Sequence, residues 1–341
     1  MATTWRLAFE DVQQAAPGVA GLLRLLAFCA PEAIPLRLLL QPRPGLADQL
    51  TPEVAPVLTP LLADQLTAKD AIGALRKYSL VTHVGEGLWS VHRLVQAVTV
   101  DQMSAGLASQ WRQTAAALIE AEIPRDPALP EAWPTHAALV PHARAVLDLT
   151  SGGMWQIARY LGFSGSYPAA RDLSRQIADA YTEDEAYGPE HPKTLADRHD
   201  LAYFTGRAGD ESGARDQLAA LLPIRERVLG PEHPETLVTR HELAVWTGEA
   251  GDAAGARDQL AALLPIRERV LGPEHPDTLT SHARLARWTG KAGDPAAARD
   301  LLDGLLSVEE RVLGPEHPYT LADRRELAHW TGRADGGPST A

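Results

Sequence analysis

One pentapeptide, Gly-Pro-Glu-His-Pro, recurs through the C-terminal half of the chain at a fixed interval. The spacing is 42 residues each time, and the four copies stand at 188–192, 230–234, 272–276 and 314–318. Residues 213–234 and 255–276 are identical at all 22 positions. Self-similarity at a period of roughly 20–50 residues indicates a repeat architecture, in which each unit buries its apolar face only by stacking on its neighbours.

Each unit predicts two helices with a break between them. Pro192 suits a first helical position, and the helix that it opens ends at 206–210 (Gly-Arg-Ala-Gly-Asp). The second helix ends at Gly230, which can adopt φ > 0 before Pro231 stops the helix. The four histidines of this turn, one per repeat, are too far apart to share a metal ion, and we interpret them as structural.

The N-terminal part has a different pattern. Four helices are expected at about 18–29, 32–40, 53–65 and 67–77, before a strand–turn–strand segment at 79–91. The sequence therefore predicts an all-α fold with one small β-hairpin. We expect a winged-helix-like domain at 1–105, a helical linker at 106–150, a solenoid of four helix pairs plus a closing helix at 151–333, and a disordered tail at 334–341.

The repeats resemble tetratricopeptide repeats of the longer kind found in kinesin light chains and many actinobacterial regulators. The resemblance covers about 188–333 and rests on Pro-x-Thr-Leu, Arg-x-x-Leu-Ala and Ile-Arg-Glu-Arg-Val-Leu-Gly-Pro-Glu-His-Pro. It implies a solenoid that binds proteins on its concave face. Kinesin-type asparagines near the Leu-Ala pair are absent here, so the peptide clamp of that family is not expected in the same form.

The N-terminal part resembles the winged-helix segment of NB-ARC-type STAND ATPases of actinobacteria. The matching residues are Leu22–Phe28, Glu32–Pro35, Leu75–Val81 and Ser90–Gln96. The resemblance places His92 where that family has a histidine that contacts the phosphate of ADP, although Val91 and Arg93 depart from the motif. No Gly-x-x-x-x-Gly-Lys-Ser/Thr occurs. We therefore expect the sensor half of such a regulator, with His92 either structural or a remnant nucleotide sensor acting in trans, and no cofactor.

Composition excludes several other classes. The net charge of −12 argues against general binding to polyanions. Cys29, the one cysteine, rules out a disulfide framework and is interpreted as a buried apolar residue. No apolar run reaches the ~18 residues of a membrane span. We therefore expect a cytoplasmic protein without a membrane partner. Enzymatic activity is not expected, because no catalytic constellation recurs.

The candidate binding surface lies on the first helices, where residues one turn apart point the same way. The predicted groove residues are His199, Tyr203, His241, Val245, Arg284, Arg287, Lys291, Arg325 and His329. Because the later members are mostly basic, we expect a protein or peptide partner with acidic character. The aromatic series Phe204, Trp246, Trp288 and Trp330 is interpreted as packing between repeats, with a ligand platform as the alternative.

Two further functions compete with an interaction module. A winged helix can bind DNA, which makes a transcriptional regulator the principal alternative. Residues 67–104 carry few basic side chains, so neutralisation of DNA phosphates would be weak. A gel shift with mixed duplex DNA separates the two functions. An enzyme is the third possibility and requires a site that these motifs do not contain. The partner, the pathway and the oligomeric state stay open.

Overall fold

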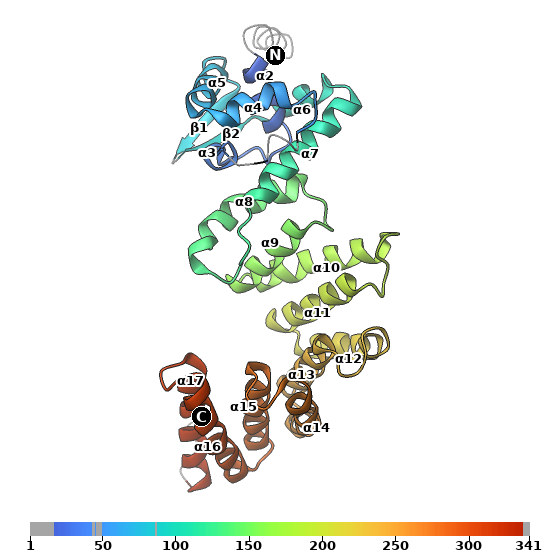
Figure 1. Cartoon of the computed structure of the whole chain (residues 1–341), viewed down its shortest axis with the longest axis vertical. Helices are drawn as coiled ribbons and strands as arrows, with labels where there is room; N and C mark the ends of the chain where they lie inside the picture. The colour runs from blue at the N-terminus through green and yellow to red at the C-terminus, as the bar shows by residue number, and fades with distance from the viewer. Residues whose placement is uncertain (1–16, 43–44, 46–49, 86, 337–341) are drawn as a thin grey trace. The chain divides into compact units, whose positions relative to one another are not determined.

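The computed structural model describes residues 17–42, 45, 50–85 and 87–336 (Figure 1). The chain forms two compact units that divide between Gly165 and Ser166. The first is helical with one hairpin, and the second is a succession of antiparallel helix pairs. The expected all-α class with one small hairpin and a helical solenoid is therefore confirmed.

Nine helices of three or more residues and one hairpin are assigned in the described part of the first unit. They are α2 (Pro17–Leu26), α3 (Leu36–Leu39), α4 (Ala55–Ala63), α5 (Gln65–Lys77), β1 (Val81–Gly85), β2 (Leu88–Val91), α6 (Arg93–Asp101), α7 (Ala105–Glu122), the 3-10 turn η2 (Pro130–Ala132), α8 (Trp133–Val146) and α9 (Gly152–Phe163). The order of helices, hairpin and helix is the one that the sequence predicts.

Helix α2 is the centre of this unit. Its residues Leu22, Leu23 and Leu26 are fully buried, because α4, α5, α6 and α7 all pack around it. The end of α2 is held by Gln96 of α6, whose side-chain amide donates to the carbonyl oxygens of Leu26 and Cys29 at 2.9 Å each. The core of the unit is thus one apolar helix fixed by a buried amide.

Two of the expected helices are shorter than the sequence suggests. The helix expected at 32–40 begins only at Leu36, because Ile34 pairs with Trp89 of β2 through two backbone hydrogen bonds of 2.6 and 3.0 Å. The helix expected at 18–29 ends at Leu26. In both places backbone groups are satisfied outside a helix, and the apolar pattern alone does not reveal this.

The described part of the second unit, residues 166–336, contains eight helices. They are α10 (Tyr167–Glu183), α11 (Pro192–Arg207), α12 (Glu211–Val228), α13 (Pro234–Glu249), α14 (Ala253–Leu271), α15 (Pro276–Lys291), α16 (Pro295–Val312) and α17 (Pro318–Ala334). Each helix packs against the next one along the chain (Figure 1). The prolines inside α12 and α14 do not end these helices. Of the tail expected at 334–341, residues 337–341 lie outside the described part.

Small residues mark where the paired helices meet. Ala202 is fully buried against Ala214 and Leu218, and the equivalent Ala244 and Ala286 are fully buried too. The 42-residue period predicts the same contact for Ala328, the fourth member of this series, but Ala328 is exposed. The reason is that no described helix follows α17 to cover this face.

Candidate binding surface on the first helices

The first helices of the repeats, α11, α13, α15 and α17, approach each other more closely than the second helices do. Tryptophan and glycine make this approach possible. The ring of Trp288 on α15 lies on Gly248 of α13, where a Cβ atom would stand 2.5 Å from it. Trp246 and Trp330 occupy the same place over Gly206 and Gly290. The interpretation as packing between repeats is therefore confirmed for these three tryptophans of the aromatic series, and the first helices form the more crowded side.

The histidine at the start of each first helix has a structural role. In His191, His233, His275 and His317, Nδ1 accepts a hydrogen bond of 3.2–3.3 Å from the backbone N–H two residues later. This satisfies one of the donors that a helix N-terminus leaves unpaired. The structural interpretation of the repeated His-Pro turn is confirmed, and its mechanism is helix capping.

The predicted groove residues do not share one environment. Tyr203 and Val245 are half-buried, whereas Arg325 and His329 are exposed on α17. His241 is buried, and its Nδ1 lies 3.0 Å from Ser281 Oγ. Burial, helped by the charges of Arg267 and Arg284, lowers the pKa of His241 to about 3. This imidazole is neutral near pH 7 and belongs to the packing between α13 and α15.

Part of the expected basic cluster is neutralised within the array. Arg287 Nη2 lies 3.5 Å from Glu249 Oε1, and Lys291 Nζ lies 3.9 Å from Glu249 Oε2. Lys291 Nζ also stands 4.4 Å from the centre of the Trp288 ring. Glu249 of α13 therefore competes with any external anion for both cations of α15.

Arg284 and Arg325 differ from these two cations, because neither forms an ion pair with any described residue. Arg284 is half-buried on α15, and Arg325 is exposed on the next first helix, α17. Arg284 acts electrostatically on the carboxyl group of Glu242 on α13. Burial raises the pKa of that group, and the charge of Arg284 offsets part of the rise. His199 is half-buried on α11.

A buried arginine at each of the first two junctions between repeats escaped the sequence analysis. Arg225 of α12 donates to the carbonyl oxygen of Leu195 at 2.9 Å, to that of Glu235 at 2.8 Å and to Thr239 Oγ1 at 2.7 Å. Its side chain thus joins three successive helices. The signal was present in the sequence, since Arg225 follows Leu218 and Leu221 on the apolar stripe of α12.

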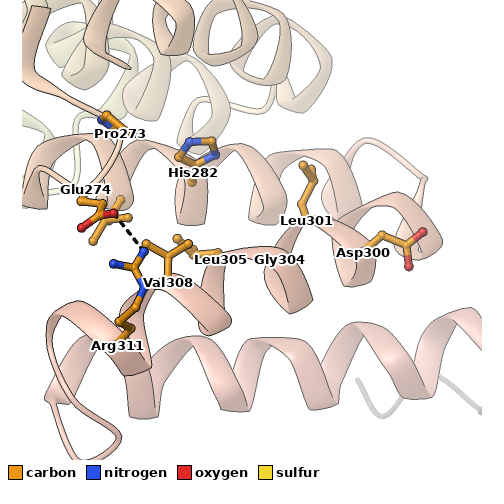
Figure 2. A pocket seen from close by; sticks show the side chains of 10 residues that line it. Pro273, Glu274, His282, Asp300, Leu301, Gly304, Leu305, Val308 and Arg311 are labelled. Carbon is orange, nitrogen blue, oxygen red and sulfur yellow. Dashed lines mark hydrogen bonds and ion pairs between the residues drawn. The ribbon is translucent and has the colours of Figure 1, made fainter. Parts of the chain in front are cut away.

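A pocket of about 350 Å³ lies between α15 and α16 (Figure 2). Leu301 and Leu305 line it, and the ion pair between Arg311 Nη2 and Glu274 Oε1, 2.9 Å long, closes one side. His282 points into the same region, and its Nε2 lies 3.0 Å from Glu268 Oε1. Gly304 replaces an alanine of the earlier repeats here, which leaves space in this unit.

In the first unit, His92 is exposed and caps α6. Its Nδ1 accepts from the backbone N–H of Leu94 at 3.1 Å. Cys29 is buried, and burial raises the pKa of its thiol to about 12. No group of three or more histidine, cysteine or acidic residues is arranged for a metal ion in the described part of the chain. Among the described helices, none combines the length and the apolarity that crossing a bilayer requires.

Comparison with known proteins gives two families and several structural likenesses. Residues 8–107 match a family described only as a domain of unknown function, DUF7779, and residues 194–235 and 248–303 match two tetratricopeptide repeat models. A search of curated proteins found no match.

Solved structures share part of the arrangement. A Podosopora anserina protein described as a kinesin light chain with nearly identical TPR-like repeats is 30% identical, over 54% of this chain and 85% of that one, with a TM-score of 0.47. BtubC from P. vanneervenii is 13% identical over 67% and 94% (TM-score 0.42). A Rap protein in complex with competence and sporulation factor is 13% identical over 88% and 85% (TM-score 0.45). At TM-scores below 0.5 these likenesses assign neither a function nor a partner. The matched segments and the stacked helix pairs identify the second unit as an array of tetratricopeptide repeats.

Proposed function

We propose that the second unit is a protein-binding scaffold whose first helices hold an acidic segment of a partner. The observation that carries this proposal is the pair Arg284 and Arg325. These two guanidinium groups lie on successive first helices and have no ion-pair partner among the described residues. The other cations of the surface, Arg287 and Lys291, are held by Glu249.

Arginine suits this task because its planar fork can hold a carboxylate through two parallel hydrogen bonds. Neighbouring helices pack about 8–10 Å apart, which an extended peptide covers in about three residues. A segment with two acidic side chains at that separation can therefore engage both arginines. The chain as a whole has a net charge of −12, so the positive potential is confined to the neighbourhood of these two arginines.

The test is a peptide-display selection against the full chain, followed by affinity measurements on the enriched peptides. We expect enrichment of Asp and Glu, and a loss of binding of at least tenfold in the Arg284→Ala, Arg325→Ala double variant. The matched control is Arg257→Ala with Arg299→Ala, which removes two arginines that also belong to successive repeats but lie on second helices and pair with Asp258 and Asp300. Equal losses in the two double variants, or no acidic enrichment, contradict the proposal.

The finer proposal for the whole chain is the sensor half of a STAND-type regulator. Its support is the resemblance around Ser90–Gln96 and the position of the hairpin-containing unit before the repeats. In this proposal the chain by itself does not bind ATP or ADP, because it lacks a phosphate-binding loop. Calorimetry with either nucleotide and Mg²⁺ tests it, and a micromolar dissociation constant contradicts it. His92 then keeps its capping role, and His92→Asn, which preserves a cap, leaves stability nearly unchanged.

A further inference from the structure

The junctions between successive repeats use equivalent positions with different chemistry. Arg267 of α14 repeats the bonding of Arg225, with donations to the carbonyl oxygen of Leu237 at 3.0 Å, to that of Asp277 at 2.6 Å and to Ser281 Oγ at 2.7 Å. The position 42 residues later is Glu309 of α16, and the partner position occupied by Ser281 becomes Asp323 of α17. The third junction therefore has two carboxyl groups where the second has a guanidinium and a hydroxyl.

Of these two carboxyl groups, that of Glu309 is buried and that of Asp323 is half-buried. The Glu309 side chain is 2% exposed, and it shares a hydrogen bond with Asp323. Glu309 Oε2 is buried, and no donor from another described residue reaches it. Two ionised carboxylates cannot share a hydrogen bond, since neither has a proton to donate, so this contact requires one of them to be protonated.

Few other charges act on the pair. Arg284 of α15 favours the ionised form of Asp323, and Glu326 of α17 opposes it. The ion pair between Arg324 Nη2 and Glu310 Oε1, 2.7 Å long, links α16 and α17 beside the pair. Ala283 of α15 stands at the position of His241, so no imidazole faces the two acids as it faces Ser281. Burial, strengthened by the charge of Asp323, raises the pKa of Glu309 to about 7.

We propose that Glu309 and Asp323 form a pH-dependent contact that holds α17 on α16. Helix α17 is docked on α16 while the pair holds a proton, and the contact weakens when that proton leaves. Helix α17 contacts α16 and α15. In repeat arrays each unit is stabilised only by its neighbours, so a weakened junction at α17 opens this helix locally and leaves the remaining repeats folded.

The sign follows from proton linkage. The folded pair binds its proton more tightly than the unfolded chain does, because the pKa of Glu309 rises from 4.5 to about 7. The docked state therefore loses stability as the pH rises between these values, and no further loss occurs above them. For one such group the equilibrium constant for opening rises about tenfold between pH 6 and pH 8.

Hydrogen exchange of the full chain, followed by mass spectrometry at pH 6 and pH 8, tests the proposal. After correction for the intrinsic exchange rates, we expect peptides from α17 to exchange about tenfold faster at pH 8. Peptides from α13 in the same sample are the internal control, because the equivalent junction pairs Arg225 with Thr239 and has no carboxyl group at either position. Equal pH dependence of α13 and α17, or none in α17, overturns the proposal.

Two variants distinguish the effect of the Glu309–Asp323 contact from general effects of pH on exchange. In Glu309→Gln the side-chain amide donates to Asp323 at every pH, so the additional exchange of α17 at pH 8 should fall below twofold. If this variant fails to fold, Glu309→Arg with Asp323→Ser copies the second junction and should give the same loss of pH dependence. A tenfold effect that persists in the folded variants contradicts the assignment to this pair. The test needs no bound partner, so it stands apart from the proposed groove function.

Discussion

Substitution of Gly248 by alanine tests how closely the first helices pack. The added Cβ atom would lie 2.5 Å from Cε2 of Trp288, whereas real Cβ contacts essentially never fall below 3.0 Å. Either the indole ring or α13 must move, and overpacking of this kind costs about 1–3 kcal/mol. Alanine also stabilises a helix interior by about 1 kcal/mol relative to glycine, which offsets part of the cost.

Gly332 provides the matched control, because it occupies the equivalent position on α17 and its added Cβ would meet nothing within 4 Å. Gly332→Ala therefore gains the helix propensity without the clash. The propensity gain is common to both variants, so their stabilities should differ by about 1–3 kcal/mol, with Gly248→Ala the less stable. Urea unfolding followed by circular dichroism measures the difference. Equal stabilities would show that the tryptophan–glycine contact does not limit the spacing of the repeats.

Three further predictions concern packing, buried charge and pH. Ala244→Leu should destabilise the array by about 1–3 kcal/mol, while Ala328→Leu, at an exposed site, should change the melting temperature little. Arg225→Ala should cost about 3–5 kcal/mol in denaturant unfolding because its buried acceptors lose their donors, whereas Arg227→Ala, which breaks an exposed ion pair, should cost less than about 1 kcal/mol. Burial raises the pKa of Asp197 to about 7, so above that pH the ionised carboxylate destabilises the folded state. Asp197→Asn should therefore raise the melting temperature more at pH 8 than at pH 5.

The repeated architecture could be predicted in detail because the same local signals occur in every unit. Proline at the start of the first helix, glycine at the break and the Leu-Ala pair all have local physical causes. The 32–40 segment could not be predicted in this way, since Ile34 is held by a strand that is distant in sequence. The expected burial of Ala328 was wrong for a related reason. Burial at this position requires a following helix that packs on it, and the repeat pattern by itself does not predict such a helix.

The sequence predicted which helices carry the candidate residues, but not how the charges of these residues are balanced. Helical spacing places Tyr203, Arg284 and Arg325 on the first helices, as the structure does. The ion pairs of Glu249 with Arg287 and Lys291 join residues 38 and 42 positions apart, a distance at which only the stacking geometry decides which side chains meet. The burial of His241 has the same origin, because it depends on Ser281 of the next repeat.

Site-specific photo-cross-linking tests the central claim, that the first helices form the protein-binding face, most directly. A photoreactive phenylalanine analogue replaces Tyr203, His329 or, as a control on the second helix α14, the exposed Asp258. Each variant is irradiated with an acidic peptide obtained by display selection on the unmodified chain. We expect cross-links from positions 203 and 329 and none from position 258. Cross-links from position 258 alone, or equally from all three positions, would contradict it.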